Sequence, residues 1–287
     1  MALKIWMNGE LVDEDQATVS IFDHGVLYGD GIFEGIRMYH GKVFKHTEHI
    51  DRLYDSARVL MLNIPMSKEE MMQAVVDTCA ANNLTDAYIR LVITRGKGDL
   101  GINPLSCPKP SIFIIAATIA LYPEELYETG LEVITAGTIR NANEALNPRV
   151  KSLNYLNNIM AKIEANNAGV AEVVMLNGKG YVAEGSADNL FIIKNKVVKT
   201  PPVTEGILEG ITRNTIMDLA REEGYEVQEC LLNRFDLYAA DEFFFTGTGA
   251  ELIPVIKYDG RVIGEGKPGP IFKKLRRHFR EFTRTGG

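Results

Sequence analysis

The sequence predicts an α+β protein of two domains, with sheets built mainly from antiparallel strands. Short runs of β-branched and aromatic residues are separated by turn dipeptides such as Asn8-Gly9 and Asn177-Gly178, which is typical of hairpins. Segments with helical periodicity are interspersed among these runs, which favours antiparallel pairing over a doubly wound parallel sheet. A length of 287 residues exceeds that of a typical single domain.

The first half of the chain is expected to form one sheet with two helices. Residues 4–12 read as an opening hairpin around Asn8-Gly9. A helix is expected from His46, because apolar side chains then recur on one face. The capping box Ser67-Lys68-Glu69-Glu70 predicts the start of a second helix. Strands are expected at residues 88–94 and 111–117.

The second half is expected to contain more strands, again in hairpins. Residues 120–130 are polar and include a proline, so they are the expected interdomain loop. A small N-terminal domain would then cover residues 1–119, and a larger, β-rich C-terminal domain would cover residues 131–287. The elements expected there are strand 131–136, helix 153–168, a hairpin at 177–180, strands 190–193 and 197–199, helix 212–223 and strand 242–245.

Composition excludes several classes of function. An apolar share of 46% with 24% charged residues is that of a globular protein with a sizeable core. A net charge of −7 argues against nucleic-acid binding, which needs Lys and Arg to neutralise phosphates. The sequence contains no apolar run long enough to span a membrane and no signal-peptide pattern, so a cytoplasmic protein is expected.

Three patterns suggest chemistry that their context does not support. Residues 96–101 spell G-x-G-x-x-G, but Pro104 and Pro108 forbid the helix that a dinucleotide site needs, so a loop that closes over a pocket is expected. His46 and His49 lack further metal ligands, and no metal site is expected. Asp30, Glu34 and Asp99 adjoin glycines and are interpreted as turn formers.

Three other segments are suited to bind a ligand. Residues 24–37 interleave glycines with aromatic side chains, which suits close approach to a ligand or, alternatively, a barrel corner. Residues 208–213 place Gly210 before a helix start that begins with Thr212, which suits a phosphate, although an ordinary N-cap is the alternative. Residues 246–250 form a second turn of hydroxyls and glycines. Two such turns are consistent with a phosphorylated ligand.

Together these motifs resemble the fold type IV enzymes that use pyridoxal 5'-phosphate, and the branched-chain amino acid aminotransferases in particular. The resemblance runs from about Ile5 to Phe282 and implies a two-domain architecture with the cofactor at the domain interface. The matching stretches are Tyr28-Gly-Asp-Gly-Ile-Phe33-Glu-Gly35-Ile-Arg37, His49-Ile-Asp-Arg52, Tyr88-Ile-Arg90, Lys151-Ser-Leu-Asn-Tyr155, Glu184-Gly-Ser-Ala-Asp-Asn189, Leu208-Glu-Gly210-Ile211-Thr212-Arg and Thr246-Gly-Thr248-Gly249-Ala250.

The resemblance implies a role for each residue of the cofactor site. Lys151 would form the Schiff base with the cofactor aldehyde and then act as the general base and acid of the proton shift. Glu184 would pair with the pyridine nitrogen, which keeps the ring an electron sink. The other implied cofactor contacts are Arg52, Tyr155, Asn189, Leu208, Gly210, Ile211, Thr212 and Thr248.

The resemblance also implies the substrates, which are L-leucine, L-isoleucine or L-valine as amino donor and 2-oxoglutarate as acceptor in a ping-pong reaction. Tyr28, Phe33 and Gly35 would form an apolar pocket, and Arg90 would bind the distal carboxylate of glutamate. The implied substrate-binding residues are Tyr28, Phe33, Gly35, Arg37, Tyr88, Arg90, Thr248, Gly249 and Ala250.

A homodimer or a higher homo-oligomer, up to a hexamer, is expected from the same resemblance. The Tyr28 segment and the loop around Gly98 would then reach the neighbouring active site. Two relatives with the same lysine and phosphate motifs stay open as alternatives: D-amino acid aminotransferase and aminodeoxychorismate lyase. From a different class, a binding protein without cofactor would leave Lys151 without a role.

Overall fold

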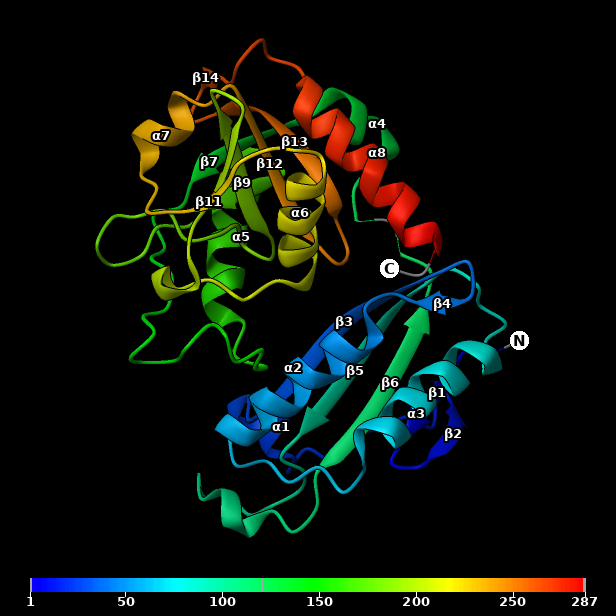
Figure 1. Cartoon of the computed structure of the whole chain (residues 1–287). Helices are drawn as coiled ribbons and strands as arrows, with labels where there is room; N and C mark the ends of the chain where they lie inside the picture. The colour runs from blue at the N-terminus through cyan, green and yellow to red at the C-terminus, as the bar shows by residue number, and fades with distance from the viewer. Residues whose placement is uncertain (1, 120, 286–287) are drawn as a thin grey trace. The chain divides into compact units, whose positions relative to one another are not determined.

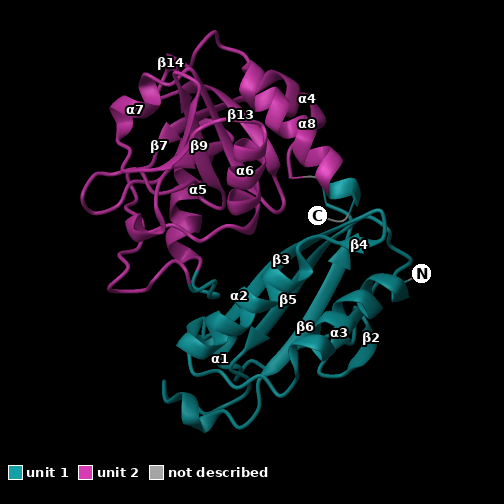
Figure 2. Ribbon diagram, viewed as in Figure 1, with its two compact units in different colours: residues 1–119, 150–154, 283–287 teal, residues 120–149, 155–282 magenta. Residues whose placement is uncertain are grey.

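The computed structural model describes residues 2–119 and 121–285, which divide into two compact units (Figure 2). Of the described residues, unit 1 contains 2–119, 150–154 and 283–285, and unit 2 contains 121–149 and 155–282. The division therefore differs from the one expected from the sequence, because two later segments belong to unit 1. The expected interdomain loop 120–130 also contains a helix, α4 (Glu124–Thr129).

Unit 1 consists of one sheet and its helices (Figure 1). Its elements are β1 (Lys4–Met7), β2 (Glu10–Asp13), α1 (His24–Tyr28), β3 (Gly31–Tyr39), β4 (Lys42–Val43), α2 (His46–Val59), α3 (Lys68–Ala81), β5 (Ala87–Thr94), η1 (Pro104–Ser106) and β6 (Ser111–Ala117). The strand order is β2-β1-β6-β5-β3-β4, and every neighbouring pair is antiparallel. The expected hairpin is present, with Asn8 and Gly9 both at positive φ, and so is the expected capping box at Ser67.

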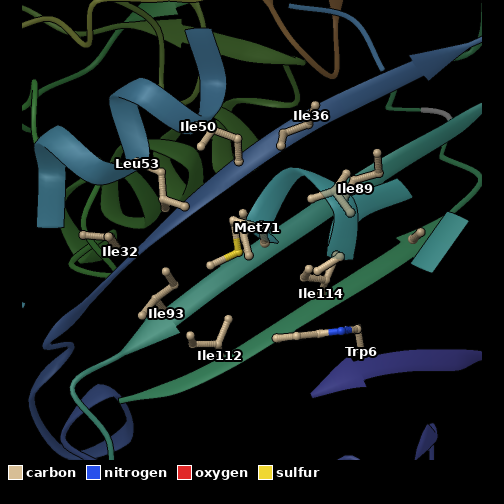
Figure 3. Close-up of a cluster of buried hydrophobic side chains, with 14 of the residues drawn as sticks. Trp6, Ile32, Ile36, Ile50, Leu53, Met71, Ile89, Ile93, Ile112 and Ile114 are labelled. Atoms are coloured by element: carbon tan, nitrogen blue, oxygen red, sulfur yellow. The ribbon is translucent and has the colours of Figure 1, made fainter. Parts of the chain in front are cut away.

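One face of this sheet is covered by α2 and α3 (Figure 3). Ile50 and Leu53 of α2 and Met71 of α3 pack on a row of strand residues that includes Ile32 and Ile36. Successive strand residues point to opposite faces. Phe33, Gly35 and Arg37 of β3 therefore share the other face with Tyr88 and Arg90, which lie opposite Arg37 and Gly35 in β5.

The segment 150–154 is also part of this sheet region, although it follows β3 only after a long stretch of sequence. Ser152 forms an antiparallel bridge with Ile32. The amide of Phe33 donates to the Lys151 carbonyl (3.0 Å), and the amide of Leu153 donates to the Gly31 carbonyl (2.9 Å). The backbone of Lys151 is thus fixed beside the first half of β3.

Unit 2 is built around a mixed sheet. Its elements are α4, β7 (Leu131–Thr135), α5 (Leu156–Ala168), β8 (Glu172–Val174), β9 (Asn189–Lys194), β10 (Val197–Thr200), η2 (Val203–Glu205), α6 (Ile211–Glu222), β11 (Val227–Glu229), α7 (Arg234–Tyr238), β12 (Glu242–Gly247), β13 (Glu251–Tyr258), β14 (Arg261–Val262) and most of α8 (Pro270–Thr285). The strand order is β11-β10-β9-β12-β13-β7-β8, with β14 paired to β13.

The pairing in this sheet is less uniformly antiparallel than the sequence suggested. The pairs β10·β11, β13·β7 and β7·β8 are parallel, and the central strands are antiparallel. Aromatic side chains lie on both faces of this sheet at its central strands. Phe243 and Phe245 belong to one buried cluster, whereas Phe244 stacks on Phe191 with 5.2 Å between the ring centroids. The mixed α and β architecture with two sheets, as expected, is confirmed.

Candidate active site

Lys151 is placed by its backbone and by the ring of Phe33. Besides the bonds to β3, the Lys151 amide donates to Oγ of Ser56 in α2 (3.3 Å). The Lys151 Nζ lies 4.6 Å from the centroid of the Phe33 ring. The backbone of Lys151 is therefore fixed beside β3 and α2, and its amine lies near the Phe33 ring.

Arg90 lies at the same aromatic ring. Its Cζ atom is 4.6 Å from the Phe33 centroid, and its Nη2 donates to the Tyr88 hydroxyl (2.8 Å). The Nε of Arg90 is buried and has no hydrogen-bond partner among the described residues. A buried guanidinium N–H without a partner is rare in folded proteins and suits an anionic ligand.

Gly35 has a role that the sequence did not reveal. It lies opposite Arg90 in the sheet, and a Cβ at this position would approach the Tyr88 hydroxyl to 2.4 Å. Only a residue without a side chain leaves the Tyr88 hydroxyl in reach of Arg90. Gly35 thus clears space for a neighbouring polar group.

Arg52 is anchored to a buried carboxylate behind the strand. Its Nε and Nη2 each donate to Glu34 at 2.8 Å, and Nδ1 of His49 makes a third bond to Glu34 at 2.8 Å. Burial would raise the pKa of Glu34, but the charge and hydrogen bonds of Arg52, together with His49, lower it to about 2. Burial lowers the pKa of His49, so a neutral imidazole donates from Nδ1.

This arrangement corrects the interpretation of Glu34 as a turn former. Glu34 is fully buried in the middle of β3, and it orients an arginine. His49, in the first turn of α2, is buried as well. Asp99 does accept from the Gly101 amide in a turn, and Asp30 pairs with Arg95. Among the described residues, no group of three or more His, Cys, Asp or Glu could hold a metal ion.

Among the predicted site residues of unit 2, Glu184 is a buried carboxylate. Its Oε1 accepts from Nε and Nη2 of Arg140 (3.0 and 2.8 Å). Its Oε2 accepts from Nδ2 of Asn189 and from the Leu208 amide, both at 3.0 Å. Asn189 also donates to the Leu208 carbonyl (2.9 Å), so residue 208 is tied to Glu184 by its backbone and not by its side chain.

The start of α6 is open to an anion. Its N-cap is Gly210, which offers no side-chain cap, so the first N–H groups of the helix have no capping partner from that residue. A Cβ at Gly210 would lie 1.9 Å from Oδ1 of Asn189. Ile211 and Thr212, the first two residues of the helix, are both buried. A glycine is required here because Asn189 fills the space that a side chain would take.

The turn after β12 is formed in a similar way. A Cβ at Gly247 would lie 1.9 Å from Oδ1 of Asp188, so the carboxylate packs directly against the backbone of the turn. The hydroxyl of Thr246 is buried and has no partner among the described residues. Thr248 is half-buried in the turn itself. A buried hydroxyl without a partner, beside a crowded glycine turn, suits a polar ligand group.

Residues 31–258 match the family model described as amino-transferase class IV. The chain belongs to this family. A Methanocaldococcus jannaschii protein, provisionally named a branched-chain-amino-acid aminotransferase, is 55% identical over 285 residues, or 99% of this chain and 98% of that protein. The branched-chain-amino-acid aminotransferase of Escherichia coli K12 is 40% identical over 281 residues, covering 96% of this chain and 91% of that protein.

Solved structures of the same kind superpose on this aminotransferase. The crystal structure of the Escherichia coli branched-chain amino acid aminotransferase aligns with a TM-score of 0.97 at 38% identity, covering 100% of this chain and 96% of that one. The branched-chain amino acid aminotransferase of T.th., solved with pyridoxamine 5'-phosphate, aligns with a TM-score of 0.96 at 37% identity and the same coverage. The fold class and the family expected from the sequence are therefore confirmed.

The predicted site residues of the aminotransferase fall into two groups, one in each unit. Unit 1 holds Tyr28, Phe33, Gly35, Arg37, Arg52, Tyr88, Arg90 and Lys151; unit 2 holds Tyr155, Glu184, Asn189, Leu208, Gly210, Ile211, Thr212, Thr248, Gly249 and Ala250. The structure brings Phe33, Arg90 and Lys151 together, whereas Arg37 lies over the Tyr39 ring and the hydroxyl of Tyr28 donates to the Leu100 carbonyl.

Proposed function

We propose that this aminotransferase moves the amino group of L-leucine, L-isoleucine or L-valine to 2-oxoglutarate in a ping-pong reaction, with pyridoxal 5'-phosphate as its cofactor. The observation that carries the proposal is that an amine and a guanidinium lie at the same aromatic ring. The amine of Lys151 and the guanidinium of Arg90 both lie 4.6 Å from the centre of Phe33. The names of the relatives and the pyridoxamine 5'-phosphate in a similar structure support it.

The residues present fit this cofactor. The uncapped N-terminus of α6 at Gly210 and the unpartnered hydroxyl of Thr246 suit a phosphate. The family resemblance implies Ile211, Thr212, Thr248 and Arg52 as further donors. Glu184 offers a fixed carboxylate to a ring nitrogen. When bound, the cofactor supplies an aldehyde for the amino group and a ring that accepts electron density. Tyr155 would donate to the ring's phenolic oxygen.

In this proposal, different residues of the chain carry out the proton transfer, hold the cofactor ring and bind the substrate. Lys151 would hold the cofactor through its amine and, as a free amine, would serve as the general base and acid that moves a proton from the substrate α-carbon. Glu184 would accept the N–H of the ring nitrogen. The Tyr88 hydroxyl and the backbone of residues 249–250 would bind the substrate α-carboxylate.

The two substrates require one site to accept an apolar and an acidic side chain. The Phe33 ring offers apolar surface to a branched aliphatic group, at about 0.8 kcal/mol per buried methylene. Arg90 offers a guanidinium at the same ring, with a buried N–H that has no partner among the described residues. A distal carboxylate would bind this guanidinium, whereas an aliphatic side chain would contact only the ring.

The absorption spectrum of the purified protein tests the proposal. We expect a visible band from the Lys151-bound cofactor that changes when L-leucine is added without a 2-oxo acid. Lys151→Ala should still bind pyridoxal 5'-phosphate through its phosphate contacts but should lose turnover and the band of the Lys151-bound form, whereas Lys68→Ala, an exposed surface lysine paired with Asp51, should keep both. A band that responds to D-alanine and not to L-leucine would favour a D-amino acid aminotransferase, and one that responds to neither would favour a lyase.

We further propose that the protein is a homodimer or a larger assembly of dimers, up to a hexamer, and that it is cytoplasmic. In unit 1, α1 and the loop 96–107 expose large apolar side chains, including Ile102 at 81% and Leu105 at 88% exposure. The hydroxyl of Tyr28 in α1 donates to the Leu100 carbonyl of the loop, which joins the two segments into one surface. Three cysteines without disulfides agree with a reducing compartment.

Sedimentation at micromolar concentration tests the assembly. The parent protein should sediment as a dimer or a multiple of it, and Leu105→Asp should shift it towards the monomer. A parent protein that is monomeric and fully active would refute the proposal. Within the part of the chain that the structure describes, no helix combines the length and the apolar character needed to cross a membrane.

A further inference from the structure

Arg140 is a buried arginine to which the reaction described above gives no role. It lies in the connection between β7 and α5 and is 7% exposed, next to Glu184 at 5% exposure. Its Nε and Nη2 donate to the same oxygen, Oε1 of Glu184, at 3.0 and 2.8 Å. A buried arginine must be compensated by an anion or by hydrogen bonds, so this pairing is a strong constraint on both side chains.

The guanidinium of Arg140 is itself fixed by two neighbouring asparagines of α5. Its Nη1 donates to Oδ1 of Asn157 and to Oδ1 of Asn158, both at 3.3 Å. Asn158 in turn donates to the Ser186 carbonyl (2.6 Å), and the Arg140 amide donates to the Leu176 carbonyl (2.9 Å). The cation is therefore oriented from several sides and points its Nε edge at Glu184.

The other oxygen of Glu184 is fixed by different groups. Oε2 accepts from Nδ2 of Asn189 and from the Leu208 amide. These two donors are neutral, whereas Arg140 brings a positive charge to the carboxylate. A buried carboxylate without a cation tends to take up a proton and lose its charge. Asn189 and Leu208 can orient Glu184, but they cannot compensate its charge.

We propose that Arg140 is a positioning residue for the amino transfer, acting through Glu184: it keeps this carboxylate charged and turned so that it can accept the N–H of a cofactor ring nitrogen. The proposal rests on the proposed function. A merely structural arginine would stabilise the fold without distinguishing cofactors that have the ring nitrogen from cofactors that lack it. This difference provides the test.

The experiment measures the affinity of the cofactor-free protein for two ligands by absorbance titration. One is pyridoxal 5'-phosphate, and the other is its carbocyclic analogue, in which C–H replaces the ring nitrogen while aldehyde and phosphate are unchanged. Arg140→Gln should weaken binding of pyridoxal 5'-phosphate by about tenfold, the loss of roughly one charge-assisted hydrogen bond, and should change binding of the analogue by less than about twofold. Equal losses for both ligands, or no loss for either, would overturn the proposal.

Two further variants keep the test decisive if Arg140→Gln folds poorly. Arg140→Lys retains a cation but loses the paired donors, so its loss of affinity for pyridoxal 5'-phosphate should be intermediate. In a double-mutant cycle with Glu184→Gln, removal of Arg140 should have no further effect on the ratio of the two affinities. An additional loss in the Glu184→Gln background would show that Arg140 does not act through Glu184.

Arg276 supplies the matched control. It is 8% exposed, lies in α8 and pairs with Glu124 and Glu128 in the same unit. Arg276→Gln should lower the unfolding temperature without changing the ratio of the two affinities. If the parent protein bound neither ligand, the proposed function itself would be refuted. If the Arg140 variants lost equal affinity for both ligands, only the proposed role of Arg140 would be refuted.

Discussion

Replacement of Glu34 by glutamine should destabilise the protein by about 3 kcal/mol. Glu34 is fully buried and accepts three hydrogen bonds of 2.8 Å, two from Arg52 and one from His49. Breaking a buried ion pair by removing one partner costs about 3–5 kcal/mol. The Arg52 side chain is 13% exposed, so water can compensate part of its lost partner, and we expect the lower end of that range. The NH2 group of a glutamine side chain would also face the N–H groups of Arg52 and His49, which are themselves donors.

Urea unfolding of the cofactor-free protein measures this effect, since bound ligand would otherwise add to the stability. Glu48→Gln is the control, because Glu48 lies on the same helix as Arg52 in an exposed pair with Lys45 and should change stability by less than about 0.5 kcal/mol. The lowered pKa of Glu34 predicts that its stabilisation is complete above about pH 4.5 and is lost as the pH falls towards about 2. The difference in unfolding free energy between the parent protein and Glu34→Gln should therefore decrease as the pH falls from about 4.5 to about 2. A loss below about 1 kcal/mol at neutral pH would refute the reasoning.

Three other predictions concern single contacts. Gly35→Ala should raise the KM for 2-oxoglutarate about fivefold in steady-state kinetics. The new Cβ would displace the Tyr88 hydroxyl, and this should weaken substrate binding by about 1 kcal/mol. An unchanged KM would contradict this. Gly210→Ala should weaken cofactor binding at least about tenfold in a titration, because the new Cβ collides with Asn189. Burial and the nearby His49 lower the pKa of His46 to about 4. The unfolding free energy should therefore fall by about 1–2 kcal/mol, allowing for solvent screening, as the pH drops from 6.5 to 4. In urea unfolding, His46→Gln should flatten this pH dependence.

Local signals predicted the elements that depend on local physics. The capping box at Ser67 starts α3, the Asn8-Gly9 turn joins β1 to β2, and Gly210 precedes α6, because caps and turns need particular residues at particular positions. The glycine-rich stretch 96–101 forms no α-helix, as the prolines after it required, and only the short η1 follows.

The supporting residues of the site could not be predicted, since long-range pairing determines them. Glu34 is adjacent to a glycine and resembles a turn former, but β5 and α2 bury it. A partial signal existed in α2, where His49 and Arg52 are three residues apart and so share a helix face. Arg140 lies in an irregular connection, where no periodicity indicates that it faces Glu184. Parallel pairs such as β13·β7 join strands far apart in sequence, which turn signals do not report.

The pairing of Ser152 with Ile32 has a consequence for how the chain folds during synthesis. Ribosomes release a protein from its N-terminus, and domains generally fold as they emerge. Strand β3 emerges early, but the backbone groups of Gly31 and Phe33 that bond to residues 151 and 153 stay without these partners until that later segment has been made. The edge of β3 is therefore exposed during translation, and an unpaired strand edge is a site for aggregation. Lys151 arrives on the segment that closes this edge, so completion of the first sheet and placement of the lysine that we propose as catalytic are a single folding event.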